Sequence, residues 1–355
     1  MDKYKMDSTK LLYHMDRVYE HYRDGKRIAP IHIDIGATSA CNSNCIYCYA
    51  RHQKKSGEIL NRDVFINLLS QAPEVGIKSI AIIGDGEPTL NPALYDAVRA
   101  GRENGLDISV GTNGIFLDTA KLTNLLSNCV WIRFNLSAGT RDGYKFVHGF
   151  DNWEVVSENI REAVRIKKEK GFKCTIGLQM VLVPQCLNEV IPEAEFAIDA
   201  GVDYLVVKQY SDPICNDMVQ VDRGWYISND TTLILQRAEK LSTSDTEIII
   251  KWGLMQFHDN KPYKSCVDVP LLIEGSGTGK LYPCGYHFRN DEYCLGDLNK
   301  NSIKEIIESD HYWNLIERLR NDFVVGKDCH GACRHDMTNC FIWDYLQPLE
   351  HENFI

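Results

Sequence analysis

The stretch Ala40-Cys41-Asn42-Ser43-Asn44-Cys45-Ile46-Tyr47-Cys48-Tyr49 carries three cysteines in the spacing Cx3Cx2C. It follows closely after the run Ile31-His32-Ile33-Asp34-Ile35, whose alternating apolar residues predict a β-strand. A loop of this length can present three thiolates to one face of an iron-sulfur cube and leave the fourth iron without a protein ligand. The thiolates of Cys41, Cys45 and Cys48 therefore suit either such a cluster, with one open iron at which a small molecule binds, or a zinc ion.

The chain around this loop alternates short β-rich runs with helical stretches, between about residues 31 and 215. Such alternation predicts βα units around a parallel sheet. The six runs with strand-like composition are 31–35, 79–83, 108–110, 131–136, 175–181 and 204–208. Asn91 and Pro92 predict the start of a helix, with Asn91 as its N-cap. In parallel βα architectures ligands bind at the carboxyl ends of the strands, so polar residues there are candidate site residues.

Length and composition limit the class of protein. A chain of 355 residues that is 44% hydrophobic can bury a barrel-sized core and one smaller appendage. No apolar stretch is as long as a membrane helix, and the first residues lack a signal-peptide core, so we expect a cytoplasmic protein with no membrane contact. Thirteen cysteines without an export signal indicate metal ligands and reduced thiols. The formal charge of −10 argues against sequence-independent nucleic-acid binding.

Polar and glycine-rich segments follow the predicted strands. Gly84-Asp85-Gly86-Glu87-Pro88 is a turn whose glycines let backbone groups approach a ligand closely. Gly111-Thr112-Asn113-Gly114 also follows a predicted strand. An ordinary Asn-Gly turn that supports the architecture explains this segment as well as a ligand-binding role does. After the fourth strand, Asn135 and Ser137 are two residues apart and are expected to face the same side.

Two further polar residues interrupt buried strands. Gln179 lies within an apolar run, and a buried amide needs either a ligand or a structural hydrogen bond. Lys208 lies in the sixth strand, where a buried cation is costly unless an anion pairs with it. The anion is either a carboxylate or phosphate of a ligand or a nearby acidic side chain.

A second group of cysteines lies past the predicted barrel. Cys266, Gly279 and Cys284 have the spacing Cx12Gx4C. Three more cysteines, Cys329, Cys333 and Cys340, follow near the C-terminus. Thiolates at such spacings suit either an iron-sulfur cluster or a structural zinc ion.

The cysteine loop is similar to that of the radical S-adenosylmethionine (SAM) superfamily, in which the residue before the last cysteine, here Tyr47, is usually aromatic. The resemblance implies a [4Fe-4S] cluster on the three loop cysteines, with SAM bound to the open iron. One electron then cleaves SAM to methionine and a 5′-deoxyadenosyl radical. The glycine-rich turn resembles the GGEP motif of this superfamily. The residues implied to contact SAM are Tyr47, Gly84, Asp85, Gly86, Glu87, Asn113, Asn135, Ser137, Gln179 and Lys208.

The Cx12Gx4C segment resembles the start of the SPASM and Twitch extensions of radical SAM enzymes, which carry auxiliary iron-sulfur clusters. Only three cysteines follow it, at spacings that differ from the full SPASM pattern, so we expect one auxiliary [4Fe-4S] cluster. The preferred ligands are Cys266, Cys284, Cys329 and Cys333, with Cys340 as the competitor for the last place. The expected fold is α/β, with an N-terminal extension (1–30), a partial (β/α)6 TIM-like barrel (31–225) and a small SPASM/Twitch-like domain (226–355). His335 and Asp336 are expected to support the cluster, contact substrate or lie on the surface.

The substrate and the outcome of the reaction stay open. Too few residues precede the first strand for a separate peptide-recognition domain, which favours a small polar substrate of the sugar, nucleotide-sugar or amino-sugar type. Lys208, Arg133 and Arg289 are its candidate anion partners. A peptide-modifying maturase and a non-catalytic zinc or iron-sulfur protein are the alternatives. If the reaction needs a hydrogen donor, Cys215 and Tyr210 are candidates, and the expected electron donor is a flavodoxin or ferredoxin.

Overall fold

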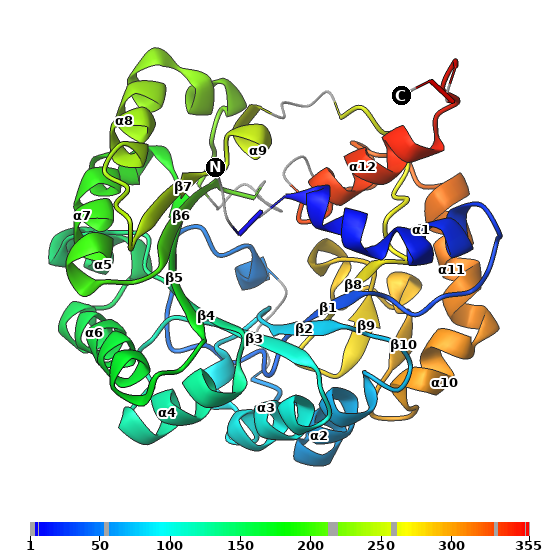
Figure 1. The fold of residues 1–355 in the computed structure, drawn as a ribbon, viewed down its shortest axis with the longest axis horizontal. Coiled ribbons are helices and arrows are strands. Elements are labelled where there is room, and N and C mark those ends of the chain that lie inside the picture. Colours follow the sequence, from blue (N-terminus) through cyan, green and yellow to red (C-terminus); the bar gives the residue numbers. More distant parts are fainter. Residues whose placement is uncertain are drawn as a thin grey trace.

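The computed structural model describes residues 4–5, 7–52, 57–211, 219–256, 261–329, 333–351 and 353–354. Within these residues the strands form one ten-stranded sheet in the order β10-β9-β8-β1-β2-β3-β4-β5-β6-β7. Figure 1 shows this sheet curving around the centre of the molecule, with most helices outside it. The expected α/β architecture, a partial TIM-like barrel with a C-terminal extension, is confirmed.

Eight strands of this sheet run parallel, from β8 through β1 to β7. The strands are β1 (His32–Ile35), β2 (Ser79–Ile82), β3 (Asp107–Thr112), β4 (Trp131–Asn135), β5 (Thr175–Leu182), β6 (Tyr204–Gln209), β7 (Glu247–Ile250), β8 (Leu272–Gly275), β9 (Lys280–Tyr282) and β10 (Gly296–Asp297). All six predicted strands are present. Two parallel strands were missed: β7 extends the sheet beyond β6, and β8 pairs with β1 on its other side. The sheet therefore continues past the predicted domain boundary at residue 225.

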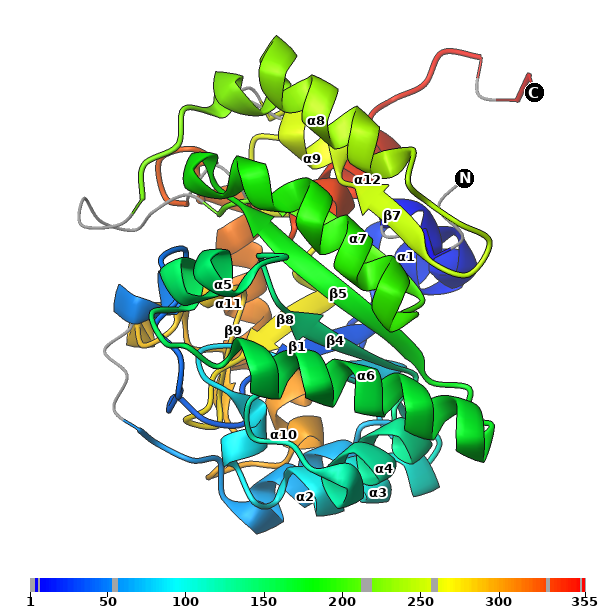
Figure 2. The same cartoon turned by 90° about the vertical axis from the view of Figure 1, so that its left-hand side faces the viewer.

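The helices connect and cover these strands (Figure 2). They are α1 (Met15–Tyr22), α2 (Arg62–Gln71), α3 (Leu94–Glu103), α4 (Thr119–Asn128), α5 (Arg141–His148), α6 (Trp153–Lys170), α7 (Val190–Ala200), α8 (Asn229–Glu239), α9 (Trp252–Gln256), α10 (Ile303–Glu308), α11 (Asp310–Asn321) and α12 (Asp336–Leu346). Short 3-10 helices are η1 (Ser8–His14), η2 (Tyr49–His52), η3 (Pro88–Leu90), η4 (Pro184–Glu189), η5 (Arg223–Ile227), η6 (Gly285–His287) and η7 (Asp291–Tyr293). None of the described helices is long and apolar enough to cross a membrane.

The two faces of the sheet differ in chemistry because successive side chains point to opposite sides. On β1, Ile33 and Ile35 are fully buried in the main hydrophobic core. His32 and Asp34 alternate with them and bond to each other. Tyr204 of β6 likewise packs in a small cluster separate from that core. We call the side that carries these residues the inner face, and it is the polar side of the sheet.

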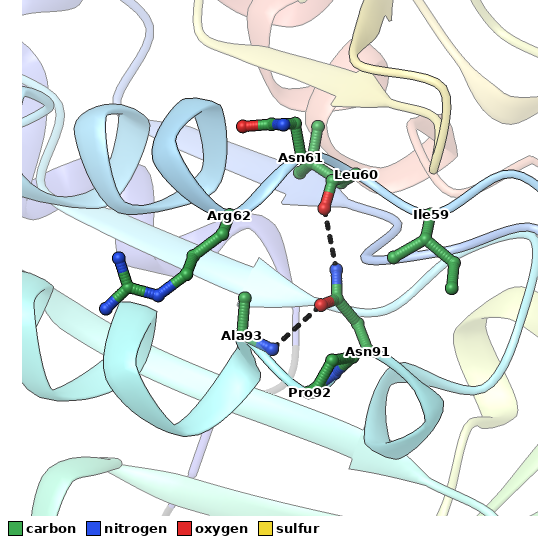
Figure 3. Close-up of a pocket in the computed structure, with 7 residues that line it drawn as sticks. All are labelled: Ile59, Leu60, Asn61, Arg62, Asn91, Pro92 and Ala93. Carbon is green, nitrogen blue, oxygen red and sulfur yellow. Dashed lines mark hydrogen bonds between the residues drawn. The ribbon is translucent and has the colours of Figure 1, made fainter.

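Asn91 fastens the segment before the cysteine loop to the segment after β2. Its side-chain amide donates to the carbonyl oxygens of Ala37 and Leu60, at 2.8 and 3.0 Å. Its side-chain oxygen accepts a hydrogen bond from the backbone N–H of Ala93, as Figure 3 shows. The predicted cap was misplaced, since α3 begins at Leu94 with Ala93 as its N-cap. Asn91 is buried and connects three segments of the chain.

We expect Asn91→Ala to lower the free energy of unfolding by about 2 kcal/mol, because two buried carbonyls each lose a donor. Urea denaturation monitored by circular dichroism measures this change. Asn104→Ala is the matched control, since exposed Asn104 bonds only the Ala100 carbonyl through its side chain. Equal losses in the two variants would contradict the proposed linking role.

Candidate active site

The cysteine loop is held by backbone hydrogen bonds on two sides. On one side, the N–H groups of Asn44 and Ile46 donate to the carbonyls of His148 and Val147 at the end of α5. On the other side, the N–H of Glu87 donates to the Ala40 carbonyl at 2.8 Å. Cys41, Cys45 and Cys48 are all half-buried thiols. The loop is thus fixed between α5 and the turn after β2.

Cys45 has a direct side-chain partner in His148. The sulfur lies 3.1 Å from Nδ1 of this imidazole and 3.3 Å from the Ser43 hydroxyl. Burial alone would raise the pKa of Cys45, but His148 outweighs it and lowers the pKa to about 7. On its other side, Nε2 of His148 donates to the Leu136 carbonyl, and the ring packs against Tyr144. Sequence reasoning missed His148, because no spacing links it to the cysteine loop.

The turn Gly84-Asp85-Gly86-Glu87 lies against the cysteine loop. A Cβ at Gly86 would collide with the carbonyl oxygens of Thr38 and Ala40, so only glycine fits there. The Asp85 carboxylate accepts a hydrogen bond from the N–H of Gly277 at 2.9 Å, and burial raises its pKa. This contact joins the turn to the segment between β8 and β9.

The Glu87 carboxylate is already occupied by the protein. It accepts hydrogen bonds from Thr89, from the Thr112 hydroxyl at 2.6 Å and from the Asn113 N–H at 2.7 Å. Burial raises the pKa of Glu87, while these donors favour its ionised form. The Asn113 side chain in turn donates to Asn42 in the cysteine loop. The Glu87 side chain is therefore engaged within the protein, and its contacts to a ligand are left to its backbone groups.

The predicted polar residues of β4 and β5 come together around Tyr47. The Tyr47 hydroxyl accepts from the Asn135 amide at 2.8 Å and lies 3.0 Å from the Ser137 hydroxyl. The Gln179 amide donates to the side-chain oxygen of Asn135 at 3.1 Å. Burial raises the pKa of Tyr47 well above its usual value, and Cys45 adds to the effect. These four residues form one polar group that begins at the cysteine loop.

The cysteines of the second group lie close enough to influence one another's pKa. Burial raises the pKa of Cys266, and Asp268, Cys333 and Cys284 raise it further. Burial likewise raises the pKa of Cys284, and Glu274 and Cys329 raise it further. Cys340 differs: burial raises its pKa to about 12, and the charged neighbours that add to this are acidic residues and no cysteine. Thiols whose ionisation is disfavoured, as at Cys266, Cys284 and Cys333, form a site that positive iron ions would stabilise.

Buried polar residues fix this second group. His335 and Asp336 are both fully buried, so a surface position for them was wrong. His335 binds both oxygens of Asp268, at 2.9 and 3.0 Å, and lies 3.3 Å from Glu274. Asn339 accepts hydrogen bonds from the N–H groups of Val267 and Asp268. Sequence reasoning missed these pairings because Asp268 and His335 are 67 positions apart in the sequence and no local pattern links them.

Asp336 pairs with Lys261 and Tyr263. The ammonium of Lys261 lies 2.6 Å from its carboxylate, and the Tyr263 hydroxyl donates to the same oxygen. Its other oxygen accepts a hydrogen bond from the N–H of Cys333 at 2.8 Å. The buried ion pair thus positions the backbone of a candidate ligand.

The donor sets fit iron-sulfur clusters. Both groups consist of thiols, the ligands that such clusters use. Among the described residues, no three His, Cys, Asp or Glu side chains converge closely enough to bind one metal ion. Ligands of a cubane bind different irons and are therefore farther apart than ligands that share one ion.

The remaining predicted residues are found in different surroundings. Lys208 and Arg133 lie half-buried on the inner face. Arg289 pairs instead with Glu58 at 2.8 Å, so it is no free anion partner. Tyr210 is buried in the main core, and Cys215 lies outside the described residues.

Family models match the two halves of this site. The radical SAM superfamily model matches residues 35–197, and the model of the SPASM iron-sulfur cluster-binding domain matches residues 276–336. The chain is a radical SAM enzyme with a C-terminal SPASM domain. It therefore works with SAM, with the [4Fe-4S] cluster that binds SAM and with auxiliary iron-sulfur chemistry, as predicted. The alternative of a non-catalytic zinc or iron-sulfur protein does not hold.

Known radical SAM proteins resemble the chain at moderate identity. A tungsten-containing aldehyde ferredoxin oxidoreductase cofactor-modifying protein from Pyrococcus furiosus is 24% identical over 78% of this chain and 80% of its own length. A probable GTP 3′,8-cyclase from Sulfurisphaera tokodaii is 29% identical over 81% of this chain and 90% of its own. The structure of SuiB from Streptococcus suis shares the fold, with a TM-score of 0.66 and 14% identity over 86% of this chain and 72% of SuiB. So does anSMEcpe with bound AdoMet, with a TM-score of 0.58 and 18% identity over 81% and 83% of the two chains.

We expect Asp336→Asn to destabilise this radical SAM enzyme by about 3–5 kcal/mol, because it removes one partner of a buried ion pair. Denaturant unfolding and iron analysis measure the loss, and the iron content should fall with the stability. The double variant Lys261→Met/Asp336→Asn should recover part of the stability. Asp344→Asn, an exposed change on the same helix, is the control. An Asp336→Asn protein as stable as this control would refute the role given to the pair.

Proposed function

We propose that this enzyme cleaves SAM reductively and abstracts hydrogen from a small polar substrate bound at the inner face of the sheet. Cys41, Cys45 and Cys48 hold the SAM-binding cluster. One auxiliary [4Fe-4S] cluster, on Cys266, Cys284, Cys329 and Cys333, assists oxidation or substrate placement. When bound, the cofactors supply a 5′-deoxyadenosyl radical. The observation that carries the proposal is that Tyr47 in the cysteine loop and Arg334 next to Cys333 both bond to residues of the polar inner face.

The chain's own residues then have definite tasks. His148 orients Cys45 and shields it from water, since both its nitrogens are engaged and it is 1% exposed. Tyr47, Asn135 and Gln179 offer a rigid set of hydrogen-bonding groups beside the cysteine loop. Rigid groups hold one C–H bond of a substrate near the radical and exclude competing reactions. Asp85 and Gly277 keep the two domains in register.

Two observations favour a small polar substrate. The inner face carries Lys208 and Arg133, cations suited to an anionic or polar molecule. Relatives that align over most of their length are named for GTP cyclisation and for modification of a cofactor. A sugar, nucleotide-sugar or amino-sugar derivative has the size and polarity that such a face can bind.

A peptide-modifying maturase is the second candidate. Its support is structural: SuiB was solved with its precursor peptide SuiA, and that complex has a TM-score of 0.63 to this chain. At 14% identity this likeness concerns the fold. The two candidates are distinguished by the molecule that gives up a hydrogen atom. The 5′-deoxyadenosine formed in the reaction carries the abstracted atom and therefore reports its source.

We expect the anaerobically reconstituted enzyme to hold about eight irons per chain and to release 5′-deoxyadenosine with dithionite. Replacing Cys41, Cys45 and Cys48 together by alanine should remove about half of the iron and all SAM cleavage. Replacing Cys266, Cys284, Cys329 and Cys333 should remove the other half. The Cys340→Ala variant should keep its full iron content. Iron retained in full by either multiple variant would show that those thiols are no ligands.

Substrate class is tested with deuterated candidates. We expect deuterium in 5′-deoxyadenosine with labelled sugar or nucleotide-sugar derivatives, measured by mass spectrometry. Candidate peptides encoded near the enzyme's gene form the second arm. Transfer only from a peptide would replace the small-molecule proposal by the maturase. A flavodoxin or ferredoxin is the proposed electron donor and can replace dithionite in this assay.

A further inference from the structure

We propose that Arg133 and Lys208 form a binding site for an anionic group, a phosphate or carboxylate, of the substrate. The site lies on the inner face, on β4 and β6. This inference rests on the proposed function, because it names the chemistry of the substrate that the inner face receives.

Arg133 is a cation without an acidic partner in the described part of the chain. Its guanidinium lies 5.0 Å from the centre of the Trp131 ring and beside the Tyr204 phenol. A Cβ at Gly177, opposite Arg133 in the sheet register, would collide with the Tyr204 ring, so this tyrosine lies across the glycine. Two aromatic rings therefore hold Arg133 in place but leave its charge uncompensated.

Lys208 is the second such cation. No described residue forms a hydrogen bond or ion pair with its ammonium group. Burial, Arg133 and Arg334 lower the pKa of Lys208 to about 8, and Asp34 opposes them only in part. Asp34 is already engaged, since one oxygen lies 2.8 Å from His32 and the other 3.0 Å from Arg334. Asp34 therefore does not neutralise Lys208.

The two uncompensated cations destabilise the inner face. A cation removed from water without a counter-ion costs free energy, and two such cations repel each other. An anion between Arg133 and Lys208 offsets both the cost of removing each cation from water and the repulsion between the two cations. It also gains charge-assisted hydrogen bonds. Arg133 is two residues from Asn135 on the same strand, so both side chains lie on the same face. An anion held there would place its molecule next to the group around Tyr47.

Binding of two probes to the reconstituted, SAM-loaded enzyme tests this site. The probes are pyrophosphate and citrate, measured by isothermal titration calorimetry under anaerobic conditions. We expect at least one to bind, and Lys208→Met and Arg133→Met to weaken it at least about tenfold each, more than either weakens SAM binding. Lys208→Arg should retain most of the affinity. Lys304→Met, at an exposed position on α10, is the charge-matched control and should change nothing.

The pH dependence provides a second readout. The groups that face Lys208 are Arg133 on β4, Arg334 after Cys333, Asp34 on β1 and Lys251 after β7. Because Lys208 loses its proton near pH 8, probe affinity should fall as the pH rises from 7 to 9. In Lys208→Arg this fall should disappear, since arginine stays charged. Without a ligand, Lys208→Met should unfold at a temperature no lower than the wild type, because it removes an uncompensated charge.

The two probes distinguish phosphate recognition from carboxylate recognition. Binding of pyrophosphate alone assigns the site to phosphate, and binding of citrate alone assigns it to carboxylate. Wild-type affinity for both probes in both methionine variants would overturn the proposal, and so would the absence of binding to the wild type. An equal or larger loss of SAM affinity would overturn it too, by assigning the cations to SAM. Failure of the proposed function looks different: the wild type would not cleave SAM, whatever its anion affinity.

Discussion

The ion pair between Asp34 and Arg334 joins the two parts of this enzyme. Asp34 belongs to the strand that leads into the cysteine loop, and Arg334 directly follows Cys333. The Asp34 side chain is only 6% exposed, so it depends on Arg334 and His32 for compensation of its charge. Asp34 and Arg334 are 300 positions apart in the sequence, and their pairing fixes the two thiol groups to one frame. The hydrogen bond from the Gly277 N–H to the Asp85 carboxylate is a second link between the same parts.

The sequence predicted the local features of the fold well. Strands with apolar runs were found because their side chains alternate or are buried, which is visible in a short window. The strand β7 was missed because Glu247–Ile250 is a short run inside a segment assigned to the extension. The pairing of β8 with β1 could not be predicted, because no local pattern specifies which distant strands become neighbours. The cap at Asn91 was misplaced because its side chain serves three segments at once.

The candidate site was predicted in its residues but not in their partners. Gln179 and Lys208 looked alike in the sequence, as polar residues in buried strands. The structure separates them: Gln179 bonds Asn135, whereas Lys208 has no such partner among the described residues. Arg289 was grouped with Lys208 but is compensated by Glu58. Whether a buried polar group is satisfied depends on residues far along the chain, so only the three-dimensional structure answers it.

The pairing of β8 with β1 bears on how the enzyme matures. During synthesis, β1 and the cysteine loop leave the ribosome early, but the second neighbour of β1 ends only at Gly275. Contacts over such separations form late, since the intervening chain must first be ordered. The strand that leads into the cysteine loop thus lacks one of its two neighbours until Gly275 has been synthesised. We therefore expect a cluster inserted after the synthesis of β8 to meet a loop whose supporting strand is paired on both sides.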